Sequence, residues 1–264
     1  MKKRFLTLAA LALLFAGLNS CSKNDPTSTI DVGLSVDIKA QITALGFGAD
    51  DAFAVEGGYI VENDIFIATE DLNKPMDLAH SLVIGNEEQY RTTNLVTGLP
   101  RTITVSYASN FSTNAKAGIV AAIARYNAEN LQLTFQEVSS GGNIHIKRVN
   151  GGNYIASAGF PSGGNPYNEV KFNKTYENYS LGFVTTVIAH EIGHCIGFRH
   201  TDYANRAYSC GSGGNEGDGG VGAIHIPGTP TTWADPNSWM LACLSATTNR
   251  PFQANDKIAL DYLY

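Results

Sequence analysis

The sequence predicts a fold of the α+β or α/β class, with a mixed twisted sheet, one long central helix and a C-terminal helix. Three observations carry this prediction. Short segments rich in β-branched and aromatic residues surround one helical pattern between residues 101 and 172. Residues 181–189 are almost wholly apolar or small, as in a helix that crosses the centre of a domain. Residues 255–264 again have a helical pattern.

A small N-terminal region is expected over residues 31–98. Within it, residues 38–45 have a helical pattern, and residues 59–68 alternate like a strand. Turn-forming residues over 85–100 mark the boundary with a larger domain, residues 99–264. The structured part of the small region holds roughly fifty residues, which is marginal for an independent fold.

The larger domain contains a series of expected strands and helices. Its expected strands are at residues 102–107, 133–138, 144–147, 154–158 and 169–172, with a helix at 115–130. The central helix follows, with Ser180 or Asn178 as its cap. Residues 211–222 are dense in glycine and are expected to form a loop. Asn255 is the expected N-cap of the final helix.

The first twenty residues have the pattern of an export signal. Three basic residues at positions 2–4 precede a short apolar run, and residues 18–21 resemble the lipobox of bacterial lipoproteins, in which the cysteine, here Cys21, carries the lipid. Residues 21–30 are expected to be a flexible tether. We therefore expect an exported bacterial lipoprotein, anchored at the outer membrane on its periplasmic or cell-surface side. A plain secretory signal is the alternative.

Charge excludes some classes of partner. The formal net charge is −6, and removing residues 1–20 takes away three of the 18 basic residues and none of the 24 acidic ones, which leaves −9. No basic run remains, so neither nucleic acid nor an anionic lipid surface is expected as a partner. The membrane is expected to be reached only through the lipid anchor, and the chain is expected to be a monomer.

Three cysteines remain if Cys21 carries lipid, and three cysteines allow at most one disulfide bond. A bond between Cys210 and Cys243 is the preferred pairing, which leaves Cys195 as a small buried hydrophobe. The other two pairings stay open.

The segment from His190 to His200 carries the strongest functional signal, because it satisfies all five fixed positions of the pattern H-E-x-x-H-x-x-G-x-x-H. His190 and His194 lie about one helical turn apart on the same face, so both imidazoles can reach one ion. Gly197 can end the helix at a positive φ, which turns the chain so that His200 returns to that ion. The alternative, a buried helix with satisfied core histidines, needs neither the glycine nor this spacing.

Three neutral imidazoles leave one coordination position of a zinc ion open, where a water molecule becomes more acidic. Glu191 follows His190 directly and lies close enough on the helix to act as a general base toward that water. The pattern therefore predicts one catalytic Zn²⁺, with His190, His194 and His200 as ligands and Glu191 as the catalytic residue.

With this block the chain resembles the metzincins, and within that clan the bacterial dual-action HEIGH metallopeptidases. Along residues 101–264, the stretch 156–172 is similar to the edge-strand region of matrix-metalloproteinase-like domains, and Ser238-Trp239-Met240 resembles the Met-turn. The resemblance implies a metzincin-like fold and a zinc endopeptidase that acts on peptides or proteins. It also implies that Met240 is an apolar floor under the ligands, and that substrate pairs with an edge strand at 154–158.

Departures from the related families carry expectations of their own. Residues 162–168 contain no His or Asp where matrix enzymes bind structural ions, so no structural zinc is expected. Ala242 stands where astacins carry a tyrosine ligand, so a resting zinc with three histidines and water is expected. Glu216 and Asp218 offer a possible Ca²⁺ site, with a solvated loop as the alternative. His145 and His225 are not expected to be ligands.

Residues 59–65 resemble the pro-segment of astacins, in which an aspartate caps the zinc. The resemblance implies that Asp64 is a possible latency switch, released by a cut near residues 98–101. The alternative is that Asp64 sits on an ordinary strand of a small packing domain.

Other functions stay open. The chain could be a narrow-specificity exopeptidase, or a protease-derived binding or adhesion lipoprotein with little catalysis. The intact Glu191 opposes the latter, because binding alone needs no general base. A purely structural zinc would need a fourth protein ligand.

Overall fold

The computed structural model of the chain describes residues 33–72, 89–217, 220–231 and 235–264. The expected signal peptide, Cys21 and the tether lie outside these residues, as does Asp218. Over the described residues, no helix is both long enough and apolar enough to span a membrane.

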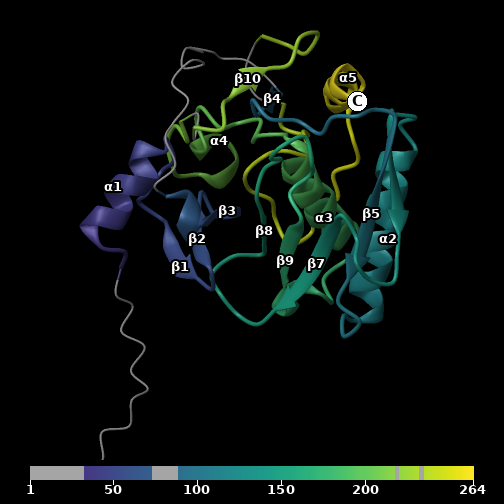
Figure 1. Ribbon diagram of the computed structural model, residues 1–264, viewed down its shortest axis with the longest axis horizontal. Coiled ribbons are helices and arrows are strands. Elements are labelled where there is room, and N and C mark those ends of the chain that lie inside the picture. The colour runs from purple at the N-terminus through teal and green to yellow at the C-terminus, as the bar shows by residue number, and fades with distance from the viewer. Residues whose placement is uncertain (1–32, 73–88, 218–219, 232–234) are drawn as a thin grey trace, which may run out of the picture. The chain divides into compact units, whose positions relative to one another are not determined.

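An eight-stranded mixed sheet forms the centre of the fold (Figure 1), in the order β1-β2-β3-β8-β9-β7-β5-β6. Its strands are β1 (Phe53–Val55), β2 (Gly58–Val61), β3 (Ile65–Ala68), β5 (Arg101–Tyr107), β6 (Leu133–Glu137), β7 (Ile144–Val149), β8 (Ala156–Ala158) and β9 (Glu169–Asn173). Strands β5, β6, β7 and β9 run parallel to one another, whereas β8 is antiparallel to β9. The predicted mixed sheet is therefore present.

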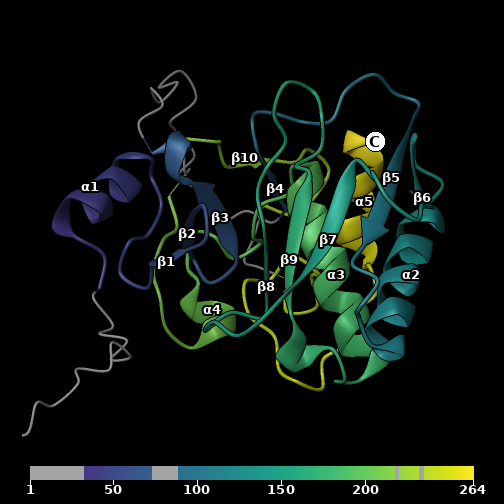
Figure 2. The ribbon, with the colours of Figure 1, turned by 60° about the horizontal axis from the view of Figure 1, so that its bottom comes forward.

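Two helices cover one face of this sheet. Helix α2 (Thr113–Asn127) and helix α3 (Leu181–Ile196) lie side by side in Figures 1 and 2 and contact each other along their lengths. Gly118 makes this approach possible, since a Cβ there would lie 2.5 Å from a side-chain carbon of Val184. The core of the domain lies between these helices and the sheet.

Helix α3 has the boundaries that its sequence indicates. The hydroxyl of Ser180 caps it by accepting a hydrogen bond from the backbone N–H of Phe183, at 3.2 Å. Gly197 ends it with a φ of 111°, a conformation that favours glycine. A Cβ at this position would lie 2.7 Å from Leu95. The glycine is thus required both for its φ and for the close approach of another segment.

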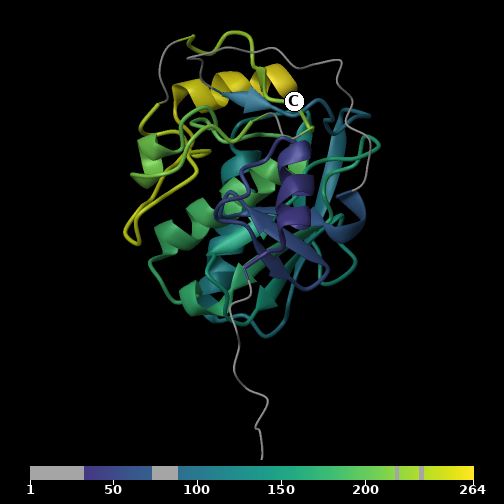
Figure 3. The same cartoon turned by 90° about the vertical axis from the view of Figure 1, so that its left-hand side faces the viewer.

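The N-terminal region adds three strands to the same sheet, next to helix α1 (Val36–Ala44) and a short 3₁₀ turn η1 (Thr69–Asp71). Figure 3, which looks at the molecule from the α1 side, shows α1 and these strands nearest the viewer and the yellow C-terminal helix α5 (Ala254–Leu263) at the top. Residues 59–68 were expected to be one strand, and that expectation was wrong. They form the hairpin β2–β3, because Glu62 and Asn63 adopt φ values of 55° and 77° and turn the chain.

Strand β8 is not at the sheet edge, contrary to expectation. Its outer side pairs in parallel with β3 through Ile65 and Ala158, and the Ala158 N–H donates to the Asp64 carbonyl at 3.0 Å. The edge strands of the sheet are β1 and β6. The hairpin therefore occupies the strand edge that was expected to bind substrate.

Residues 89–97 run alongside the turn that follows α3, outside the eight-stranded sheet. Strand β4 (Tyr90–Arg91) pairs with β10 (Ile224–His225), and the backbone N–H of Arg199 donates to the Tyr90 carbonyl at 2.9 Å. The Thr92 N–H donates to the Gly197 carbonyl at 2.8 Å. This segment therefore holds the turn that follows α3.

The C-terminal part closes the fold. Cys210, at the end of α4 (Ala207–Cys210), forms a disulfide bond with Cys243, and Cys195 is free and buried, so the preferred pairing is confirmed. Helix α5 is capped by Gln253 and not, as expected, by Asn255. A reciprocal pair of hydrogen bonds between Gln253 and Asp256 displaces the cap by two positions.

Candidate metal centre and active site

Three histidine side chains converge at the C-terminal part of helix α3. His190 and His194 come from the helix, and His200 comes from the turn after Gly197. Nε2 of His190 lies 3.0 Å from Nε2 of His194 and 3.3 Å from Nε2 of His200. All three residues are at least 97% buried, since their exposed fractions are 3%, 0% and 0%.

Each ring is oriented through its other nitrogen. Nδ1 of His190 lies 2.9 Å from the Trp239 carbonyl, and Nδ1 of His194 lies 2.8 Å from the Phe198 carbonyl. Because a carbonyl oxygen only accepts, these rings donate from Nδ1 and turn an unprotonated Nε2 toward each other. Burial, with the charges of the other two histidines, also holds the pKa of His194 well below its ordinary value. Neutral imidazole is the form that binds a metal ion.

These positions fit a zinc ion. Four ligands at zinc–nitrogen distances lie about 3.3 Å apart when they are arranged as a tetrahedron. The observed Nε2 separations are 3.0 and 3.3 Å. Lone pairs that face one another this closely repel, so a cation among them would stabilise the arrangement. The donor set of three buried imidazoles is one that zinc prefers.

Asp64, from the turn between β2 and β3, contributes a fourth donor. Its Oδ2 lies 3.3 Å from Nε2 of His200 and 3.4 Å from Nε2 of His190. One ligand atom from each of these four residues lies within 4.8 Å of the others. Burial acts to raise the pKa of Asp64, but the charges of His200 and His190 outweigh burial and lower it. In the full-length chain, the position expected to hold water is therefore occupied by a carboxylate.

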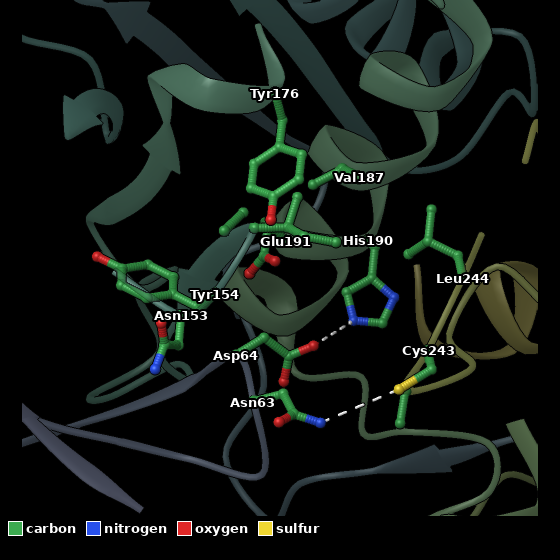
Figure 4. A pocket seen from close by; sticks show the side chains of 13 residues that line it. Asn63, Asp64, Asn153, Tyr154, Tyr176, Val187, His190, Glu191, Cys243 and Leu244 are labelled. Carbon is green, nitrogen blue, oxygen red and sulfur yellow. Dashed lines mark hydrogen bonds and ion pairs between the residues drawn. The ribbon is translucent and has the colours of Figure 1, made fainter. Parts of the chain in front are cut away.

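Glu191 lies beside this group with its carboxylate inside the site, as Figure 4 shows. Its Oε2 is buried and accepts no hydrogen bond from any residue that the structure describes. Burial, together with the carboxylate of Asp64, raises the pKa of Glu191 well above its ordinary value. A buried carboxylate oxygen without a protein donor is available to a ligand.

The family comparison identifies the class of protein to which this centre belongs. The family model for the dual-action HEIGH metallo-peptidases matches residues 59–264. The chain belongs to the dual-action HEIGH metallopeptidase family. It is therefore a zinc metallopeptidase, as its sequence predicted.

Solved structures with some likeness to this metallopeptidase include two of myroilysin. One is 17% identical, with a TM-score of 0.45, over 65% of this chain and 96% of myroilysin. The other is 16% identical, with a TM-score of 0.40, over 62% and 83%. High choriolytic enzyme 1, a hatching-enzyme zinc protease of the medaka fish Oryzias latipes, is 17% identical with a TM-score of 0.35, over 53% and 66%. Curated protein sequences contain no match. The family assignment rests on the family model.

The Met240 segment lies directly against helix α3 in this metallopeptidase. Met240 is fully buried, and a Cβ on Gly193 would lie 2.6 Å from its sulfur and 3.2 Å from Nε1 of Trp239. Gly193 stands between the two helical histidines, so the segment packs under them. The carbonyl of Trp239 also orients His190.

A cavity of about 270 Å³ opens beside Glu191 and His190 in the metallopeptidase (Figure 4). Its walls include Val187, Leu244 and Tyr176, whose hydroxyl points toward Glu191 in the figure. None of the described residues that line it is Lys or Arg. The carboxylates of Asp64 and Glu191 also line it, and the cavity can accept a side chain next to the reactive centre.

The remaining candidates lie elsewhere. Nδ1 of His145 contacts the Ser106 hydroxyl at 3.0 Å, and Nε2 of His225 contacts the Thr229 hydroxyl at 2.9 Å. Neither belongs to a metal-binding group among the described residues. The possible calcium site stays a prediction, because Asp218 lies outside the described residues. Its other candidate, Glu216, contacts His200 instead, with Oε1 2.8 Å from Nδ1.

Sequence reasoning missed this role of Glu216 in the metallopeptidase. The residue lies 16 positions after His200, in the glycine-rich loop. No local pattern links a loop carboxylate to a histidine at that distance. The sequence offers one weak signal: residues 207–215 carry no charged side chain, so Glu216 is the first acidic residue after an uncharged stretch.

Proposed function

We propose that this metallopeptidase is a zinc endopeptidase that the full-length chain keeps latent through Asp64. The observation that carries the proposal is the placement of four donors, three imidazoles and the Asp64 carboxylate, around one point beside Glu191. His190, His194 and His200 would hold the zinc ion. Anchoring through Cys21 remains part of the proposal and rests on the sequence alone.

Bound zinc would supply an electrophilic centre that polarises the substrate carbonyl and makes water more acidic. Glu191 then accepts the proton of the attacking water and passes it to the departing amine. Its buried, unpartnered Oε2 supports this role, because a general base needs free acceptor capacity directed into the site.

Strand β8 is the proposed guide for the substrate backbone. An extended peptide can pair with its outer side by main-chain hydrogen bonds, once β3 leaves that side. The adjoining cavity then takes one side chain of the substrate. The described cavity lining holds no Lys or Arg that could pair with the terminal carboxylate of a substrate. This favours an endopeptidase over a carboxypeptidase.

Latency follows from two contacts of the same hairpin. Asp64 occupies the fourth donor position, while its own carbonyl and β3 occupy the outer side of β8. Both the reactive centre and the backbone guide are therefore covered by one element. A substrate has to displace this element, or a cut has to release it.

Glu191→Gln tests the proposed chemistry. The variant has nearly the same shape, so the expected result is about one zinc per chain with no hydrolysis of casein or a peptide library after the hairpin is released. Wild-type protein treated in the same way serves as the control. Hydrolysis by the variant would overturn the role of Glu191.

A structural zinc site is the second candidate, because four protein ligands also describe a closed site. The two differ after release of the hairpin. A structural site would lose its zinc or its fold, whereas a latent enzyme would keep zinc on three histidines and begin to hydrolyse peptides.

A further inference from the structure

We propose that Glu216 is a positioning residue that fixes the His200 imidazole for metal binding, an inference that rests on the proposed zinc site. Oε1 of Glu216 lies 2.8 Å from Nδ1 of His200, and both side chains are buried, with exposed fractions of 2% and 0% for the residues. An ionised carboxylate can only accept a hydrogen bond, so Nδ1 of His200 carries the proton. Nε2, the other ring nitrogen, faces the ion.

His200 needs such support more than the other two histidines. His190 and His194 are held on one helix, and backbone carbonyls orient their rings. His200 lies beyond the helix, after the turn at Gly197, and its Nδ1 meets a side chain from a separate loop. It is the only one of the three whose Nδ1 acceptor is a carboxylate among the described residues.

The glycine-rich loop delivers Glu216 by its backbone. The Glu216 N–H donates to the Tyr203 carbonyl at 2.8 Å, which ties the loop to the chain just after His200. Gly217 follows with a φ of 71°, and a Cβ there would lie 1.9 Å from the Gly46 carbonyl oxygen. Only glycine permits this turn and this contact.

Arg199 fixes the loop from the other side. Its Nη1 donates to the Gly222 carbonyl at 3.1 Å, and its Nη2 donates to the Gly217 carbonyl at 3.2 Å. The same Nη2 lies 3.6 Å from Oε2 of Glu216 and 3.8 Å from Oε2 of Glu62. The residue directly before the third histidine thus holds the loop that orients this histidine.

A carboxylate in this place does two things for a ligand. It fixes the tautomer and the orientation of the ring, and it raises the basicity of the nitrogen that faces the metal. Removal of such a partner in other zinc sites weakens metal binding about 10- to 100-fold. We expect Glu216→Ala to weaken zinc binding within this range, and Glu216→Gln, which keeps an acceptor oxygen without the charge, to lie between Ala and wild type.

The experiment measures zinc itself, on the full chain stripped of metal. Zinc affinity is determined by competition with a chromogenic chelator for wild type, Glu216→Gln and Glu216→Ala. The same proteins are loaded with Co²⁺, whose visible absorption reports ligand geometry. Thermal unfolding of the metal-free proteins shows whether each variant folds.

Glu62→Gln is the matched control, because Glu62 is also a buried carboxylate that faces Arg199, but its Oε1 accepts a hydrogen bond from the Gly48 backbone N–H and not from a histidine. We expect its zinc affinity to change much less than that of Glu216→Ala. Equal zinc affinities and Co²⁺ spectra for wild type and folded Glu216→Gln and Glu216→Ala would overturn the role of Glu216. An equal loss in Glu62→Gln would also overturn it, since the effect would then come from charge alone.

Failure of the proposed function gives a different result. If wild-type protein binds no zinc, or binds it equally well after His194→Ala, the zinc site itself is wrong. If wild-type binding depends on His194 while Glu216 variants bind normally, only the inference about Glu216 fails.

Discussion

Asp64 Oδ2 lies 3.3 Å from Nε2 of His200, although 136 positions separate the two residues in the chain. The contact brings the N-terminal hairpin into the reactive centre. It also explains why the hairpin joins the main sheet at β8, since the same turn supplies both the carboxylate and the backbone pairing.

Asp64→Asn should activate the uncut chain. The amide removes the charge that holds the turn at the three histidines, and loss of a contact to a charged group costs about 1.5–3 kcal/mol. We expect peptide hydrolysis to rise roughly tenfold or more. Rates on a quenched peptide substrate check this, with Asn63→Gly as the control, because Asn63 lies on the same turn and its side chain points at Cys243. Unchanged activity in Asp64→Asn would argue that Asp64 is not the latch.

The position of an activating cut should matter. Residues 89–97 hold the turn after α3 through the contacts of Tyr90 and Thr92, so they belong with the active centre. A protease site inserted within residues 73–88 should release the hairpin and leave a stable, active product. A chain that starts at Arg101 should instead be unstable and bind zinc poorly. Thermal unfolding and zinc content compare the two. Equal behaviour would show that the segment is dispensable.

Gly193→Ala should destabilise the protein, even though alanine is intrinsically better than glycine in a helix by about 1 kcal/mol. The added carbon would meet the Met240 sulfur at 2.6 Å, so Met240 and Trp239 must shift. Overpacking of this kind costs about 1–3 kcal/mol. Denaturant unfolding measures the loss, with Gly214→Ala as the control, because no atom lies within 4 Å of a Cβ at that position. A gain in stability would show that Met240 and Trp239 can move away from helix α3 without an energetic cost.

Loss of the Cys210–Cys243 bond should lower both stability and substrate binding. The bond closes a loop over a sequence separation of 33, for which the chain-entropy relation gives about 3–4 kcal/mol. Cys243 also lines the cavity beside Glu191. We expect the Cys210→Ser, Cys243→Ser protein, once its hairpin is released, to show a lower Tm and a higher KM than the wild type. A lower Tm with an unchanged KM would show that the disulfide bond stabilises the fold but does not shape the substrate cavity.

The buried carboxyl of Asp256 should make stability depend on pH. Burial is the main cause that raises its pKa to about 6, with a contribution from Asp235. The ordinary value in an unfolded chain is about 3.9. The folded state therefore binds this proton more tightly, and the associated stabilisation is complete below about pH 4 and lost as the pH rises to about 6.

Two pH units of difference correspond to roughly 3 kcal/mol. The measurement is the free energy of unfolding of wild type minus that of Asp256→Asn, across pH 4 to 7. We expect this difference to fall as the pH rises and to level off above about pH 6. The Asn variant loses an acceptor for the Gln253 N–H, which offsets the curve at every pH without changing its slope. A flat difference would contradict the raised pKa.

Local rules were sufficient for the ligand helix. The spacing of His190 and His194 places both rings on one face for any α-helix, and Gly197 supplies the φ that brings His200 back. The same applies to the strands of the larger domain, whose positions follow from side-chain alternation within each segment. Such features depend on neighbours within a few residues, so a sequence contains the information directly.

Prediction from short sequence patterns failed where no glycine or proline marks an unusual backbone conformation. Glu62 and Asn63 turn the chain at positive φ without a glycine or proline, so residues 59–68 read as one strand. The cap of α5 moved from Asn255 to Gln253 for a related reason. Gln253 and Asn255 can both stand at a helix start. Gln253 is the cap because the carboxylate of Asp256 accepts a hydrogen bond from its backbone N–H.

Taken alone, the order of residues determined the family and the course of the main strands, and it predicted the metal ligands and the general base. Tertiary structure decided which distant groups meet those ligands: Asp64 from the hairpin, Glu216 from the glycine-rich loop, and β3 against β8. The reason is physical. Helical and strand periodicities act over a few residues, whereas these contacts form only when the sheet closes and buried charges must find partners.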